Sequence, residues 1–119
     1  HITKKLVCTN PDLTVHRGNV EELCAGSIAK EFEKLGGEVI YFGKPYNEIY
    51  KMCFNSNEKV LAIGDNLRTD IRGANNLSID CLFITDGVHR DEYKNVSELD
   101  TLFKKYNVKA NFFQNELKW

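Results

Sequence analysis

The chain has 119 residues, 42% of them hydrophobic and 28% charged, which is typical of a globular domain and not of a disordered or membrane protein. Its net charge of −1 gives no reason to expect a nucleic acid or an anionic membrane as partner. The chain also lacks an apolar run near the roughly 20 residues of a membrane span, and we expect neither such a span nor a secretory leader.

Strand and helix patterns alternate along the chain. Short apolar runs that end in glycine or in a turn cluster predict strands, and apolar residues at 3.6-residue spacing predict helices. In chain order we expect a strand at 6–9, a helix at 23–35, a strand at 39–42, a helix from Pro45, a strand at 60–63, a short helix at 69–76, a strand at 81–84 and a helix at 97–106. This alternation predicts βαβ units and a parallel sheet in an α/β fold.

Smaller features carry further expectations. Ser97 followed by Asp100 resembles a capping box at the start of the last helix. The histidines have no acid partner or metal-binding spacing, so we expect surface positions for His1, His16 and His89. We expect aromatic residues of the tail to pack on the core, with a partner-binding patch as the alternative; these are Phe112, Phe113 and Trp119.

The four cysteines do not form a zinc-binding motif. They stand far apart in the sequence, and each falls within an apolar segment, which predicts buried and reduced thiols. Reduced thiols are typical of a reducing compartment, so we expect the protein in the cytoplasm. The positions are Cys8, Cys24, Cys53 and Cys81.

The stretch from Lys59 to Asp70, KVLAIGDNLRTD, is the most informative in the chain. Its apolar run predicts a buried parallel strand, and Gly64 leads from that strand into a loop with two acids, Asp65 and Asp70. Parallel α/β sheets bind ligands outside the carboxyl ends of their strands, where Asp65 could hold Mg²⁺ and Asp70 could support it. The alternative is that Asp65 is only a turn residue and that Asp70 caps the helix that follows.

Lys44 follows another predicted strand, in the sequence Gly43-Lys44-Pro45. It would project from the same edge of the sheet, where a lysine can neutralise a phosphate beside carboxylates. A solvated surface lysine is the alternative. Asn10 and Asp12, together with Asn66 in the acidic loop, are candidate substrate-binding residues. An Asx-Pro turn would also explain the first two.

Together these motifs resemble the haloacid dehalogenase (HAD)-like phosphohydrolases, in particular the subclass IIA members that are NagD-like or nitrophenylphosphatase-like. The resemblance covers roughly residues 6 to 90, and GKP followed by GDNLRTDI is its most specific part. It implies that Lys44 is the lysine of the third family motif, Asp65 the Mg²⁺ ligand and Asp70 its acidic support. It further implies half of a Rossmann-like HAD core at 39–119 and a remnant of the α/β cap at 1–38.

Two family motifs, the nucleophile motif and the Ser or Thr of the second motif, are missing from their required places. The reaction of the family uses an upstream D-x-D motif whose first Asp attacks phosphorus to form an aspartyl-phosphate. Asp86-Gly87-Val88 resembles the end of that motif, but residue 84 is Ile and the segment lies downstream of the acidic loop. We therefore expect the C-terminal part of a Mg²⁺-dependent phosphatase, inactive alone, whose complete form acts on a small phosphorylated substrate.

Two other functions stay open at this stage. The chain could be an inactive remnant that serves as a binding or oligomerisation module, and we expect a homo-oligomer or a complex with a complementary N-terminal fragment. A receiver-like signalling domain also places acids and a lysine at strand ends. In a receiver the lysine follows the phospho-accepting aspartate, whereas Lys44 precedes Asp65 here, which counts against this class.

Overall fold

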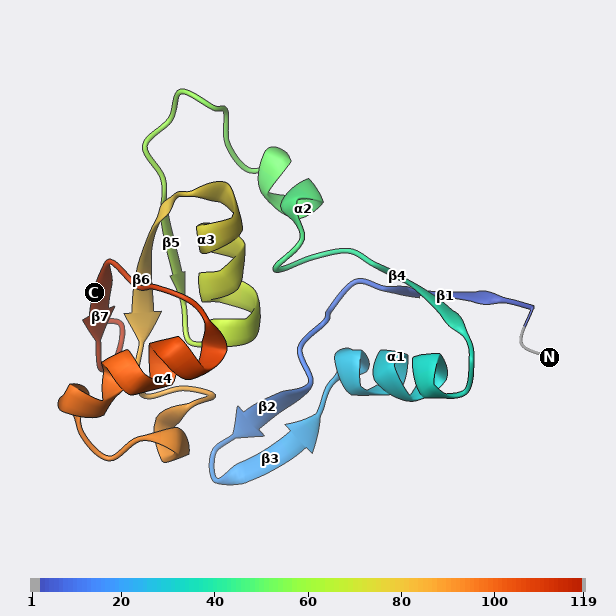
Figure 1. The fold of residues 1–119 in the computed structure, drawn as a ribbon, viewed down its shortest axis with the longest axis horizontal. Coiled ribbons are helices and arrows are strands. Elements are labelled where there is room, and N and C mark those ends of the chain that lie inside the picture. The colour runs from blue at the N-terminus through green and yellow to red at the C-terminus, as the bar shows by residue number, and fades with distance from the viewer. Residues whose placement is uncertain (1–2, 119) are drawn as a thin grey trace.

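The strands of the computed structural model, which describes residues 3–118, form three small sheets (Figure 1). Two of these sheets belong to the N-terminal part of the chain and the third to the C-terminal part. β1 (Lys5–Cys8) pairs in parallel with β4 (Glu38–Tyr41), and β2 (Thr14–Arg17) forms an antiparallel hairpin with β3 (Val20–Leu23). The third sheet is parallel and has the order β5 (Leu61–Gly64), β6 (Asp80–Ile84), β7 (Phe112–Gln114).

The helices are short and alternate with the parallel strands, as the sequence predicts. Short π-helical and 3₁₀ segments precede two of them, at Leu67–Ile71, Arg90–Glu92 and Val96–Glu98. The four α-helices are α1 (Ala25–Lys34), α2 (Asn47–Lys51), α3 (Arg72–Leu77) and α4 (Leu99–Tyr106). The α/β class and the parallel sheet are therefore confirmed. None of the helices that the structure describes is long and apolar enough to cross a membrane.

The core lies on one face of the β5–β6–β7 sheet, beneath α3 and α4 (Figure 1). Cys81 and Phe83 point to this face from β6, and both are fully buried. Phe83 packs edge-on against Phe103 of α4, with 5.6 Å between ring centroids. The remaining core residues come from the π-helical segment, the two helices and the strand that leads to β7; they are Leu67, Ile71, Ala74, Leu99, Leu102 and Val108.

The opposite face of the same sheet is apolar and largely open. Leu61 and Ile63 of β5 are each 46% exposed, and Phe112 of β7 is 56% exposed. The register aligns Ile63, Leu82 and Phe112 in one row across the three strands. The edge of β5 that faces away from β6 has no strand partner within residues 3–118. This surface is therefore as apolar as a protein core, but no other element of the described residues covers it.

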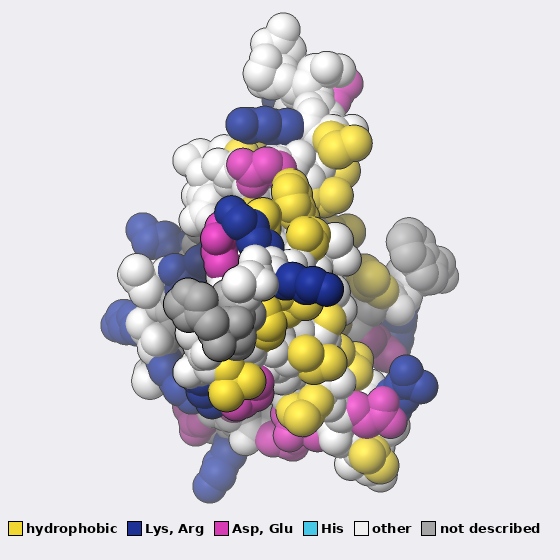
Figure 2. Space-filling model, turned by 90° about the vertical axis from the view of Figure 1, so that its right-hand side faces the viewer, with side chains coloured by type: hydrophobic (Ala, Val, Ile, Leu, Met, Phe, Trp, Pro, Cys, Tyr) yellow, Lys and Arg dark blue, Asp and Glu magenta, His cyan; other side chains and the backbone are white. Residues whose placement is uncertain are grey.

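A second open apolar surface lies beside β1 and β4. Figure 2, which looks onto the end of the molecule that carries these strands, shows hydrophobic side chains at the surface there. Val7, Ile40 and Phe42 are exposed in this part of the chain. The predicted boundary between residues 38 and 39 falls inside this region, within β4, whose pairing partner is β1.

The β2–β3 hairpin was not predicted. Its strands carry charged residues without a clear alternation, so they give no apolar pattern of period two. Gly18 adopts a φ of +62° in the two-residue turn between the strands, a conformation that glycine adopts without strain. Leu23, which the sequence placed on the apolar stripe of α1, instead ends β3 and is 79% exposed.

Two smaller expectations are wrong. His89 is fully buried and has an acid partner, Glu92, one helical turn later. Phe112 and Phe113 are about half exposed, because each lies on β7 at the margin of the sheet. His1 and Trp119 lie outside the described residues.

The capping box and the uniform burial of the cysteines are also not observed. The acid that accepts a backbone N–H near the start of α4 is Glu98, which bonds the amide of Lys94 at 3.0 Å, while Ser97 bonds Asn95. The four thiols are free, but only two of them are buried. Cys8 and Cys81 are buried, Cys24 is partly buried and Cys53 is exposed.

Candidate active site at the carboxyl ends of the strands

The acidic loop begins where β5 ends. Gly64 closes the strand, and the π-helical segment that follows turns Asp70 back beside it. A Cβ atom on Gly64 would lie 2.2 Å from the carboxyl carbon of Asp70, so only glycine permits this close approach. The Asp70 side chain is buried, and its Oδ2 accepts a hydrogen bond of 3.1 Å from the backbone amide of Asn66. The loop therefore holds Asp70 in a fixed position.

Lys44 lies across from this carboxylate. Its Nζ donates a hydrogen bond to Oδ1 of Asp70, forming an ion pair between residues 26 positions apart in the chain. Burial alone would lower the pKa of Lys44, but the hydrogen bond and charge of Asp70 outweigh it and raise the pKa. The carboxylates of Asp12 and Asp65 add to this increase. Lys44 is therefore a permanent positive charge beside three acids.

Asp65 occupies the first position after β5. Its Oδ2 accepts a hydrogen bond of 3.0 Å from the backbone amide of Val88, in the loop that follows β6. Gly87 makes this approach possible, since a Cβ atom there would lie 2.3 Å from the Cβ of Asp65. Within residues 3–118, no donor hydrogen-bonds to the other oxygen of this carboxylate. Asp65 therefore has one oxygen held by the protein and one left for a ligand.

Asn10, Asp12 and Asn66 connect the N-terminal part of the chain to the loop. Oδ1 of Asp12 accepts hydrogen bonds from Nδ2 of Asn66 at 2.9 Å and from the Thr69 hydroxyl at 2.8 Å. Oδ1 of Asn10 accepts the amide of Asp12 at 3.2 Å, which is an Asx turn. Asn66 is buried, and its Oδ1 accepts the amide of Arg68. Asp12 and Asn66 thus engage each other, and Asn10 alone of the three is exposed.

The structure brings together residues that the sequence analysis singled out separately. Asp12, Lys44 and the pair Asp65 and Asp70 come from three segments and meet outside the carboxyl end of β5. Thr69 and the segment Gly87–His89 also contribute, and the sequence analysis did not identify them. Gly87, three residues after the end of β6, was the available signal for the second of these, since a glycine permits a close backbone approach.

The donor set fits a partial Mg²⁺ site. The described residues contain no cluster of three or more His, Cys, Asp or Glu side chains that could hold a metal ion. Mg²⁺ nevertheless needs only one or two carboxylates when waters and phosphate oxygens complete its shell. Asp65 offers a free oxygen, whereas both oxygens of Asp70 already accept hydrogen bonds. Asp65 is therefore the direct candidate, and Asp70 fits a supporting position.

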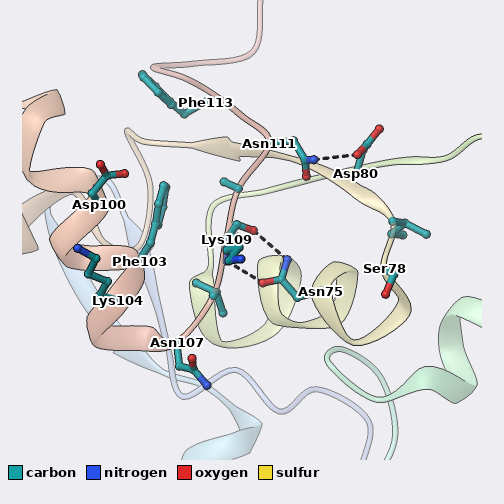
Figure 3. Close-up of a pocket in the computed structure, with 13 residues that line it drawn as sticks. Asn75, Ser78, Asp80, Asp100, Phe103, Lys104, Asn107, Lys109, Asn111 and Phe113 are labelled. Carbon is teal, nitrogen blue, oxygen red and sulfur yellow. Dashed lines mark hydrogen bonds between the residues drawn. The ribbon is translucent and has the colours of Figure 1, made fainter.

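A cavity of about 790 Å³ lies away from these acids, near the start of β6 (Figure 3). Asp80, the first residue of β6, lines it, together with residues of α4 and of the segment that leads to β7. Four of the lining residues already pair with each other. Asn75 exchanges two hydrogen bonds with the backbone of Lys109, and Asn111 donates to Asp80 at 2.8 Å (Figure 3). The cavity is thus not part of the candidate site.

Comparison with known proteins identifies the family. A family model described as HAD-hydrolase-like matches residues 41–106, which is more than half of the chain. The ribonucleotide monophosphatase NagD of Escherichia coli K12 is 30% identical over 89 residues, which are 71% of this chain and 34% of NagD. A haloacid dehalogenase-like hydrolase from Brucella suis 1330 is 37% identical with a TM-score of 0.64, over 75% of this chain and 38% of that chain.

The fold extends to a more distant structure. A glycerol phosphate phosphatase from Mycobacterium tuberculosis, solved in complex with magnesium, has a TM-score of 0.69 at 22% identity. The match covers 96% of this chain and 33% of that chain, and at this identity it shows the fold alone.

The chain belongs to the haloacid dehalogenase-like hydrolases. Within that family it groups with subclass IIA, the NagD-like and nitrophenylphosphatase-like phosphatases, as the sequence motifs predict. The chain spans about a third of the length of the curated relatives that it matches.

Proposed function

We propose that this chain is the part of a Mg²⁺-dependent phosphatase that carries the metal-binding loop and the lysine of the third family motif, and that the complete enzyme hydrolyses small phosphomonoesters. The observation that carries this proposal is the convergence of Lys44, Asp65 and Asp70 outside the carboxyl end of β5. That edge is where parallel α/β sheets bind ligands. The known relatives with phosphatase activity support the same reaction class.

Each residue has a distinct role in this proposal. Asp65 would hold Mg²⁺ through its free oxygen, and the ion would supply positive charge to phosphate oxygens. Lys44 would neutralise a second part of the phosphate, because it stays charged beside the acids. Asp70 fixes Lys44 through their ion pair and orients the loop through the Asn66 amide. Asn10, Asp12 and Asn66 would contact substrate where the N-terminal segment meets this edge.

The family motif requires an attacking aspartate in a D-x-D sequence, and this chain contains no such sequence. We therefore expect no turnover of a generic aryl phosphate above background, with Mg²⁺ present, because metal and lysine alone form no covalent phosphoryl intermediate. The measurement is release of the aryl alcohol by the purified chain, with Asp65→Asn as control. Turnover that Asp65→Asn abolishes would require a nucleophile within the chain and would contradict the proposal.

Metal binding gives the proposal a direct test. Because Asp65 is the one direct carboxylate, we expect a dissociation constant in the millimolar range or weaker. Mg²⁺ at about ten times this constant should raise the free energy of unfolding by about 1.4 kcal/mol. The measurement is thermal unfolding in MgCl₂ against NaCl of equal ionic strength.

The controls for this experiment are two single substitutions at the same sheet edge. Asp65→Asn should abolish the stabilisation by Mg²⁺. Asp86→Asn should keep it, because Asp86 is an exposed carboxylate after β6 that takes no part in the site. Equal stabilisation of the unmodified chain and Asp65→Asn would show that the ion binds elsewhere, and the metal assignment would be wrong.

A second candidate function is a binding or oligomerisation module without catalysis. The observation that favours it is the open apolar face of the β5–β6–β7 sheet, with Leu61, Ile63 and Phe112 exposed. A homo-oligomer or a complementary N-terminal fragment would cover this face. Such a cover does not conflict with the proposed phosphatase role, since the site lies at the end of the strands. For the location we propose the cytoplasm, because all four thiols are free.

A further inference from the structure

The fully buried His89 contacts the loop that carries Asp65. Its Nε2 lies 3.1 Å from the backbone nitrogen of Leu67, the first residue of the π-helical segment. A backbone N–H can only donate, so Nε2 must be the unprotonated, accepting nitrogen of the ring. The amide of Leu67 is one of the donors at a helix start that lack a partner within the helix. His89 supplies the missing acceptor.

The other ring nitrogen is fixed by a carboxylate. Nδ1 of His89 lies 2.6 Å from Oε1 of Glu92, which requires the proton on Nδ1 when the imidazole is neutral. Glu92 is held in turn by Lys105 at 2.5 Å and by the Tyr106 hydroxyl at 2.8 and 2.9 Å. Burial alone would raise the pKa of Glu92, but these hydrogen bonds lower it to about 2. Burial lowers the pKa of His89 despite Glu92.

The residue before His89 contacts the same loop. The amide of Val88 donates to Oδ2 of Asp65, so two neighbouring residues hold the loop at Asp65 and at Leu67. The contact through His89 is rigid, because the ring packs edge-on against Tyr106, with centroids 4.8 Å apart. A movement of the ring would therefore move the backbone two residues after Asp65.

We propose that His89, as the neutral imidazole with its proton on Nδ1, is a positioning residue for the Asp65 loop and sets the direction in which the free oxygen of Asp65 faces a bound cation. The consequence for the cation rests on the proposed function, whereas the hydrogen bond to Leu67 is a property of the chain itself. A histidine that only fills space between Phe83 and Tyr106 would need neither a defined tautomer nor an acceptor aimed at Leu67.

The first measurement needs no substitution. In the ¹⁵N-labelled chain, the Leu67 amide nitrogen and Nε2 of His89 should show a coupling through the N–H···N hydrogen bond. The ring nitrogens should show a proton on Nδ1 and none on Nε2 at neutral pH. A protonated Nε2, or an absent coupling in a folded sample, would overturn the proposal.

The second measurement separates positioning from packing. His89→Gln places a carbonyl oxygen near the position of Nε2 and keeps an acceptor for Leu67. His89→Asn has a shorter side chain that keeps a donor for Glu92 but cannot reach Leu67. We expect His89→Asn to weaken Mg²⁺ binding about tenfold, the lower end of the range for lost supporting contacts at metal sites. His89→Gln should stay within about twofold of the unmodified chain.

The outcomes distinguish this inference from the function on which it rests. If the unmodified chain binds Mg²⁺ at Asp65 and both variants bind it equally well, His89 does not position the loop and the proposed function stands. If both variants lose affinity equally, His89 acts through packing, and the proposal is again overturned. If the coupling is present but Mg²⁺ does not bind, the positioning contact is supported and the metal assignment fails. Should neither variant fold, the coupling in the unmodified chain decides.

Discussion

Replacing Phe83 by alanine should cost about 3–5 kcal/mol of unfolding free energy, the range for deleting a fully buried aromatic ring. Phe83 is 0% exposed and packs against Phe103 in the face of the sheet that α3 and α4 cover. Small domains have total stabilities of roughly 5–15 kcal/mol, so this variant should be partly unfolded at ordinary temperature. The measurement is urea unfolding followed by circular dichroism.

The matched control makes the same substitution on the open face. Phe112→Ala removes an equal side chain from β7, but Phe112 is more than half exposed. In dilute solution we expect a loss below about 1 kcal/mol, as for surface positions away from special features. If Phe112→Ala destabilised the chain as much as Phe83→Ala, the assignment of one covered and one open face would be wrong.

The second large effect concerns the mass of the protein in solution. We expect the chain to form a dimer or higher oligomer in solution, or to bind a complementary N-terminal fragment. The free edge of β5 presents unpaired backbone groups, and the neighbouring apolar face would be covered at roughly 25 cal/mol per Å² buried. Light scattering tests this expectation. A monomeric mass near 13.7 kDa with cooperative unfolding would show instead that the chain is self-sufficient.

A charge on the edge strand provides the matched variants for this test. Ile63→Lys places a charge on β5 at the open face, where a second chain would have to bury it, and should shift the mass toward the monomer. Val96→Lys adds the same charge at an exposed position in the 3₁₀ segment before α4 and should leave the mass unchanged. Equal behaviour of the two variants would place the interface elsewhere.

Local patterns in the sequence predict the parallel strands β1, β4, β5 and β6 and the residues at their ends, but not β7, which lies in a weakly patterned tail. Apolar runs ended by Gly43 and Gly64 locate β4 and β5, and the polar residues that follow must then lie near one sheet edge. For this reason Lys44, Asp65 and Asp70 could be identified before the structure was known. Their spacing also carries the family resemblance, which the family match confirms.

Contacts between distant segments could not be predicted in the same way. His89 looks like a surface residue because its two partners are a backbone amide 22 positions earlier and an acid whose own position depends on α4. Leu23 follows the period of α1, but the pairing of β2 with β3 takes it into a strand. In both cases the decisive interaction is tertiary, and a local pattern does not contain it.

The central claim is that the loop after β5 binds the metal of a phosphatase site, and a Mg²⁺ titration of the ¹⁵N-labelled chain tests it most directly. The amides of residues 64–70 should shift first and farthest, with a midpoint in the millimolar range or weaker. The shifts should disappear in Asp65→Asn and persist in Asp86→Asn. If the largest shifts arise at other residues, or persist unchanged in Asp65→Asn, the account of this site is wrong.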